Sequence, residues 1–194
     1  MKRDAGFSLL ELLLACSLGF LLFGSATTAL FSEQRLGSRV GGLLRQRQLL
    51  LRAHQLIAAD VKRGITLAPE LVSACTLAGR QPWLQILGAD GSVTTYSLGS
   101  PPSGIWRGQV LMRCGPAYGL DGQIKAGSTS QNRVVLDGLT PLSGAWTSCS
   151  LPQAEVLSGA SVCWEPVSGL VQWQLQINGN GVSTQKAGQA LLEG

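Results

Sequence analysis

A single carboxylate, Glu11, lies inside a long apolar segment near the start of the chain. The segment covers residues 7–31, and Glu11 is the only charged residue in it. As a helix this segment would be about 37 Å long, which is enough to cross a bilayer with some tilt. A carboxylate in hydrocarbon is costly, so its presence there indicates a functional role. The alternative is a carboxyl group that is protonated or hydrated at the membrane interface.

The residues before the apolar segment form a short basic leader, residues 1–6, which carries Lys2 and Arg3. Under the positive-inside rule this end stays in the cytoplasm, and everything after about Phe31 is exported. A secretory signal has an apolar core of 7–15 residues, and its cleavage site follows that core. Here the apolar segment is longer, and the expected cleavage site lies before this segment, at the end of the leader. We therefore expect residues 7–31 to be kept as a single-pass anchor in the inner (cytoplasmic) membrane.

The junction between leader and anchor resembles the class III signal of type IV prepilins, which pilins share with the pseudopilins of type II secretion. The resemblance rests on Gly6 followed by Phe7, an apolar helix that begins at Phe7, and Glu11 four residues later. It implies that a prepilin peptidase cuts between Gly6 and Phe7 and that the new N-terminus on Phe7 is methylated. It also implies that Glu11 pairs with the free α-amine of a neighbouring subunit during filament assembly.

From residue 32 to about residue 65 the helix is expected to continue as an amphipathic arm. Two adjoining rows of apolar residues follow helical spacing, and Gly64 with Pro69 predicts the end of the helix. The first row consists of Leu36, Val40, Leu43, Leu50, Ile57 and Val61, and the second of Leu44, Leu51, Ala58 and Ile65.

The basic character of the chain is concentrated in this arm. Residues 33–63 hold seven basic and two acidic side chains, whereas residues 64–194 hold six basic and seven acidic ones. Arginines can neutralise phosphates, which leaves open a DNA contact through a DNA-uptake pilus. No aromatic residues interleave with these arginines to stack on bases, so a solvated helix face is favoured over a nucleic-acid partner.

Residues 66–194 are expected to form a β-rich exported head. Charged residues make up only 13% of the chain, and 25 glycines indicate short strands and tight turns. The fold class is therefore α+β, a long N-terminal helix packed on an antiparallel sheet, as in pilins. The predicted hairpins are 83–87 with 93–98 and 162–165 with 170–177, and further strands are predicted at 105–114 and 133–136. Irregular structure is predicted for 115–132, for 137–160 and for the polar tail after Gly179.

Four of the five cysteines lie in the head, and the fifth, Cys16, is expected to be a small apolar residue of the anchor. An even number behind a membrane-targeting segment predicts two disulfides formed in an oxidising compartment. Three pairings are possible, and all three stay open. Zinc is the weaker alternative, because no two of these cysteines are closely spaced and no histidine lies near them. The candidates are Cys75, Cys114, Cys149 and Cys163.

Residues suited to catalysis are scarce. The only histidine, His54, is expected on the surface of the arm, where no nucleophile or orienting carboxylate is predicted beside it. Asp121 in a glycine-rich stretch is expected to form a turn rather than a calcium site. We find no nucleotide-binding loop, nucleophile elbow or metalloprotease motif. The sequence therefore predicts no enzymatic activity, cofactor or metal.

Within the pilin superfamily, residues 56–64 resemble the end of the helix in the W and J types of minor pilin and pseudopilin. Four exported cysteines and a long head favour a minor subunit that initiates or caps a filament. Its implied partners are the prepilin peptidase and methyltransferase, other minor and major pilins, and an inner-membrane assembly platform. The alternatives are a pseudopilin of a type II secretion system and, from another class, a single-pass membrane-anchored periplasmic binding domain that keeps residues 1–6 and never polymerises.

Overall fold

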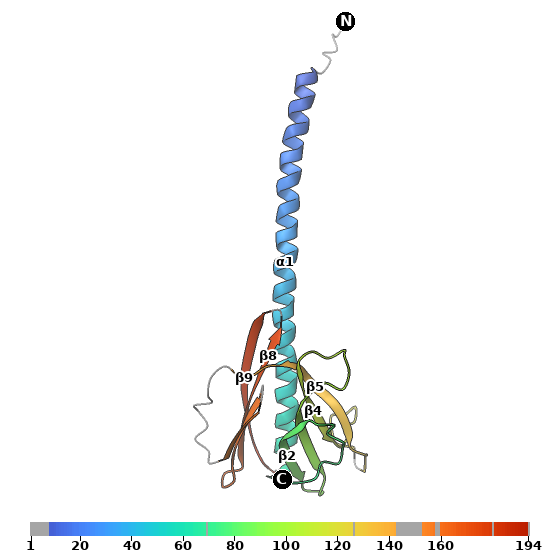
Figure 1. Cartoon of the computed structure of the whole chain (residues 1–194), viewed down its shortest axis with the longest axis vertical. Helices are drawn as coiled ribbons and strands as arrows, with labels where there is room; N and C mark the ends of the chain where they lie inside the picture. The colour runs from blue at the N-terminus through green and yellow to red at the C-terminus, as the bar shows by residue number, and fades with distance from the viewer. Residues whose placement is uncertain are drawn as a thin grey trace. The chain divides into compact units, whose positions relative to one another are not determined.

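The structure is a computed structural model that describes residues 8–68, 70–125, 127–142, 153–157, 160–179 and 181–193. It contains one long helix, α1 (Leu9–Lys62), followed by nine strands among the described residues. Contacts within the chain define two units, Met1–Gly42 and Leu43–Gly194. The predicted α+β class is confirmed (Figure 1).

The first unit consists, in its described part, of the N-terminal part of α1. Almost every side chain there is exposed, and the helix is long and apolar enough to cross a membrane. Its hydroxyl side chains donate hydrogen bonds to backbone carbonyls three residues earlier, so they are satisfied within the helix, as an apolar surrounding requires. These hydroxyls belong to Ser17, Ser25, Thr27, Thr28 and Ser32.

The second unit is an antiparallel sheet with the last turns of α1 packed on it (Figure 1). The strand order is β1-β2-β3-β4-β5-β8-β7-β6, and β9 pairs with β8. A single residue pair, Leu139 with Ile177, joins β5 to β8. The strands are β1 (Gly64–Leu67), β2 (Gln81–Gly88), β3 (Val93–Gly99), β4 (Gln109–Gly115), β5 (Gln131–Leu139), β6 (Gln153–Leu157), β7 (Ala160–Glu165), β8 (Leu170–Gly179) and β9 (Val182–Leu191).

The C-terminal members of the first apolar row supply the helix side of the core, whereas Leu36 and Val40 of that row are 65% and 47% exposed. Leu50, Ile57 and Val61 are almost completely buried against the sheet, together with Ala53. In the second predicted row, Ala58 packs against the core, whereas Leu44, Leu51 and Ile65 are 54%, 41% and 45% exposed and do not belong to it. One stripe is enough because the sheet meets the helix along one side only.

Both predicted hairpins are confirmed, β2 with β3 and β7 with β8. The strand predicted at 105–114 begins later, at Gln109, and that predicted at 133–136 extends over Gln131–Leu139. Strand β1 was not expected, and the prediction that residues 137–160 are irregular is wrong at β6, which pairs with β7.

The prediction of an irregular tail after Gly179 is wrong, because β9 pairs with β8 along its whole length. Large apolar residues do not mark this strand, since its inward positions include Gly188 and Ala190. A Cβ atom at Gly188 would lie 2.5 Å from His54 Nδ1 and 2.7 Å from the Trp173 ring. Packing against two rings therefore requires a small residue, which removes the usual strand signal.

Candidate functional site

The predicted assembly carboxylate, Glu11, lies at the start of α1. Its Oε2 accepts a hydrogen bond from the Ser8 backbone N–H at 3.2 Å, and the Ser8 hydroxyl accepts one from the Glu11 N–H at 3.4 Å. This reciprocal pair is a capping box, which satisfies two donors at a helix N-terminus. Gly6 and Phe7 lie outside the described residues. Glu11 thus has a structural contact that the resemblance alone did not imply.

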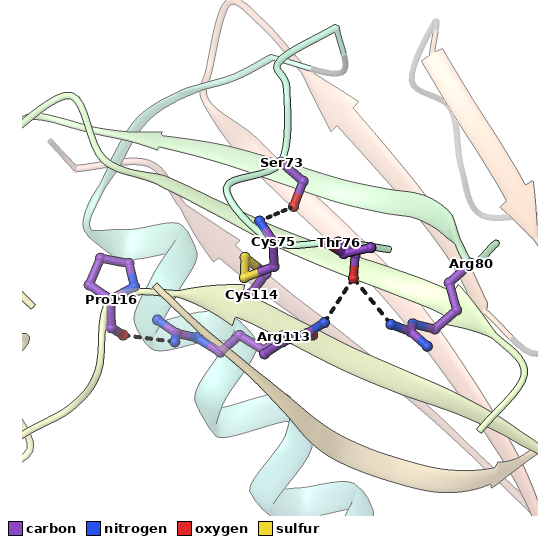
Figure 2. The surroundings of a disulfide bond; sticks show 8 residues. Ser73, Cys75, Thr76, Arg80, Arg113, Cys114 and Pro116 are labelled. Atoms are coloured by element: carbon purple, nitrogen blue, oxygen red, sulfur yellow. Dashed lines mark hydrogen bonds between the residues drawn. A yellow bond between two sulfur atoms is a disulfide. The ribbon is translucent and has the colours of Figure 1, made fainter. Parts of the chain in front are cut away.

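Disulfide bonding is present among the described cysteines of the head. Cys75 is bonded to Cys114, and Cys163 is also disulfide-bonded. Cys149 lies outside the described residues. Figure 2 shows the Cys75–Cys114 bond joining the segment before β2 to strand β4. Asn132 ties the same segment to β5 by donating a hydrogen bond to the Thr76 carbonyl at 3.2 Å.

The most densely bonded polar group of the second unit is Asp60, near the end of α1. Its carboxylate is buried and accepts hydrogen bonds from the Tyr96 hydroxyl at 2.6 Å and the Tyr118 hydroxyl at 2.5 Å. Arg113 binds it through two nitrogens, Nε at 2.7 Å and Nη2 at 3.0 Å. Arg63, one turn later, donates to it at 3.1 Å. Helix and sheet are therefore joined by a carboxylate whose acceptor sites are all used.

Register explains why two of these donors converge. Tyr96 on β3 and Arg113 on β4 are directly paired across the ladder, so their side chains lie on the same face of the sheet. Arg113 also donates to the Pro116 carbonyl at 2.9 Å, and Figure 2 shows its guanidinium near that oxygen. The next residue, Cys114, faces the other side of the sheet, since side chains alternate along a strand.

The loop after β4 closes over this group through Tyr118. Its ring stacks on two guanidinium groups, with the Cζ atoms of Arg63 and Arg113 at 4.7 and 4.8 Å from the ring centre. Arg63 Nη2 also donates to the Tyr118 hydroxyl. A bridge from Tyr118 to Ile124 holds the loop in a narrow turn.

Electrostatics within the group favour one protonation state for Tyr96 and one for Arg113. Burial raises the pKa of Tyr96 well above its usual value, and the negative charge of Asp60 raises it further, so Tyr96 stays protonated and donates. Burial acts to lower the pKa of Arg113, but its hydrogen bonds to Asp60 and the attraction between the two charges raise it overall. The group holds a fixed ion pair.

The prediction that His54 lies on the helix surface is wrong, because its side chain is only 6% exposed. Its Nδ1 accepts a hydrogen bond from the Trp173 indole N–H at 2.6 Å, and the two rings lie 20° from parallel. Burial, followed by the positive charge of Lys186, lowers the pKa of His54 to about 4. A neutral acceptor that packs on an indole is suited to the core rather than to acid–base catalysis.

A metal site finds no support in the part of the chain that the structure describes. No three His, Cys, Asp or Glu side chains converge there in a way that would hold an ion. Asp121 accepts a hydrogen bond from the Gln123 N–H at 3.0 Å within an exposed turn, as expected of a turn residue.

The chain matches no family model, no curated protein and no solved structure. Inferences about function therefore rest on the residues themselves. Sequence reasoning missed the Asp60 group, because three of its four partners, Tyr96, Arg113 and Tyr118, are 36 to 58 positions away along the chain. It also missed the capping box at Ser8 and Glu11. The capping box has a recognisable signal, the spacing Ser-x-x-Glu before an apolar run.

Replacing Asp60 by Asn should destabilise the second unit by about 3 kcal/mol or more, because the buried Arg113 charge loses its counter-ion. The matched control is Lys62→Gln, which removes an exposed pair with Glu193 at 4.0 Å and should cost less than about 1 kcal/mol. Both changes in stability are measured by denaturant unfolding of the full chain in detergent, with the fluorescence of buried Trp83 and Trp173 as the signal. Equal stabilities of the two variants would refute a central role for Asp60.

Stability should fall as the pH drops from about 6.5 towards 4, by about 3 kcal/mol over this window from His54 alone. In the unfolded chain His54 takes up a proton at the ordinary histidine pKa, whereas in the folded chain it does so only near pH 4. The contribution of His54 to the free energy of unfolding is therefore complete above pH 6.5 and is lost on acidification. Unfolding curves of the native chain and of His54→Gln measured across this range should therefore converge as the pH falls. Parallel curves would contradict the proton linkage, since the carboxylates titrate in both chains.

Proposed function

We propose that this chain is a minor, low-abundance pilin-like subunit, processed by a prepilin peptidase, that helps to initiate or cap a pilus filament. The observation that carries the proposal is the Gly6–Phe7 junction with Glu11 at the start of a long apolar helix. The α+β architecture supports it, because one N-terminal helix packed by its last turns on an antiparallel sheet is the fold that the resemblance implies.

A single pass through the inner membrane, with the N-terminus in the cytoplasm and the head exported, is part of the proposal. The prediction of this orientation from Lys2 and Arg3 is weakened by Arg35 and Arg39, which follow the apolar segment on its other side. The Cys75–Cys114 disulfide gives stronger support, since such bonds form and persist in oxidising compartments. The head would then leave the membrane as part of a pilus or pseudopilus.

The capping box is compatible with a role for Glu11 in assembly. A carboxylate has about four acceptor sites, so the bond to Ser8 leaves capacity for an ammonium group. Cleavage after Gly6 would place a free amine on Phe7, directly before the capping residue. Pairing of opposite charges is strong in a layer of low dielectric constant, which would favour one register between neighbouring helices. The proposed partners are the peptidase and methyltransferase, other minor and major pilins, and the inner-membrane assembly platform.

The N-terminal peptide of the chain purified from its own membranes should begin at a methylated Phe7. Peptide mass measurement checks this, and a Gly6→Leu variant, in which the junction is blocked, should keep residues 1–6. An unprocessed native chain would instead favour a single-pass anchored periplasmic binding domain. Separating a pilus subunit from a type II secretion pseudopilin then requires a secretion assay on cells that lack the chain.

Glu11→Ala and Glu11→Gln should both leave the chain inserted and processed but impair its incorporation into filaments. Gln can still accept the hydrogen bond of the capping box, whereas it cannot pair with an ammonium ion, so this variant separates the two roles. Recovery of the chain in sheared filament fractions, relative to the membrane fraction, is the measurement. Normal incorporation of Glu11→Gln would assign the residue to helix capping alone.

A further inference from the structure

A cavity of about 320 Å³ lies within the second unit, between one side of α1 and the strands β4 and β5. The helix contributes Arg52 and Leu56, and the sheet contributes Arg113 and Arg133 with the valines of β5. Its volume is in the range of cavities that hold small ligands. Arg113 and Tyr118 belong both to the Asp60 group and to the lining of the cavity.

All the charged side chains that line this cavity are basic. Three arginines line it and no acidic residue does. Arg113 is buried and neutralised by Asp60, whereas Arg52 and Arg133 are exposed, and neither forms an ion pair with a residue that the structure describes. An anion placed between these two guanidinium groups would gain charge-assisted hydrogen bonds from both.

Most of the remaining wall of the cavity is apolar, although Gln131 and Tyr118 add polar groups. Its apolar part comes from Ala53 and Leu56 on the helix, Val135 on β5, and Ala117 in the loop after β4. A hydrated inorganic anion would gain nothing from such a wall, whereas an aliphatic group would bury apolar surface against it. The ligand chemistry that fits is therefore an anionic head joined to a small apolar body.

We propose that this cavity is a binding site for a carboxylate attached to a small apolar group, with Arg52 and Arg133 as the residues that hold the carboxylate. Planar guanidinium groups match a carboxylate through paired N–H donors, which favours this anion. Such a ligand is either a free aliphatic acid or the carboxyl-terminal residue of a peptide. The site goes beyond the proposed filament role and does not depend on it.

The test measures binding to the full chain in detergent micelles by calorimetry at low salt. The probes are 4-methylpentanoate, a free aliphatic acid, and acetyl-alanyl-leucine, a peptide with a free carboxyl end. The comparison compounds are the amide of each acid and inorganic phosphate. We expect both acids to bind, both amides to bind at least tenfold more weakly, and phosphate to bind more weakly than the better acid. The tighter of the two acids identifies the source of the ligand.

Arg52→Gln and Arg133→Gln should each weaken binding of the better acid about tenfold, because each removes a charge-assisted contact. The matched control is Arg47→Gln, which changes an exposed arginine of the same helix that does not line the cavity and should leave binding unchanged. Both test positions are exposed, so the fold should survive, as unfolding curves can verify. Absence of binding by either acid, equal binding of phosphate, or an equal effect of Arg47→Gln would overturn the proposal.

Discussion

The second unit depends on the burial of one carboxylate. Asp60 sits on the last full turn of α1, and without partners a charge at that depth would cost several kcal/mol. Five hydrogen bonds from the sheet, the following loop and the helix itself compensate it. Apolar packing of the helix stripe tolerates small shifts, but a bidentate ion pair does not, so we infer that Asp60 fixes where along the sheet the helix comes to rest.

Strand β4 carries fixed contacts on both of its faces at neighbouring positions. Arg113 points to the helix and binds Asp60, while Cys114 points to the opposite face and is bonded to Cys75. Tyr96, paired with Arg113 across the ladder, adds a second contact on the helix side. The helix, the sheet and the segment before β2 are thereby held together at one level of the sheet. If either the Arg113–Asp60 ion pair or the Cys75–Cys114 disulfide were lost, the other contact would still hold its own face of β4.

The parts of this fold that could be predicted are those encoded in local patterns. Helical spacing predicts Leu50, Ile57 and Val61 as core residues, and alternation predicts both hairpins, because a few neighbouring residues contain the signal. The Asp60 group could not be predicted, since its donors come from distant strands, and His54 meets a partner 119 residues away. Strand β9 escaped prediction because the rings that it covers require a small residue there. At Glu11 the sequence alone contains both the prepilin junction and the capping spacing.

Whether a charged group already has a partner distinguishes residues that stabilise the fold from candidates for ligand binding. Asp60, Tyr96 and Arg113 are buried and bonded to one another, so the charge of Asp60 is already neutralised by Arg113. Arg52 and Arg133 hold no counter-charge among the described residues, although Arg133 lies on the same sheet as Arg113 and both line one cavity. Two exposed arginines without a counter-charge add little to the stability of a fold. An anion with an apolar body would pair with these charges and cover the apolar side chains beside them, and that is the physical reason to look for a ligand there rather than at the more densely bonded carboxylate.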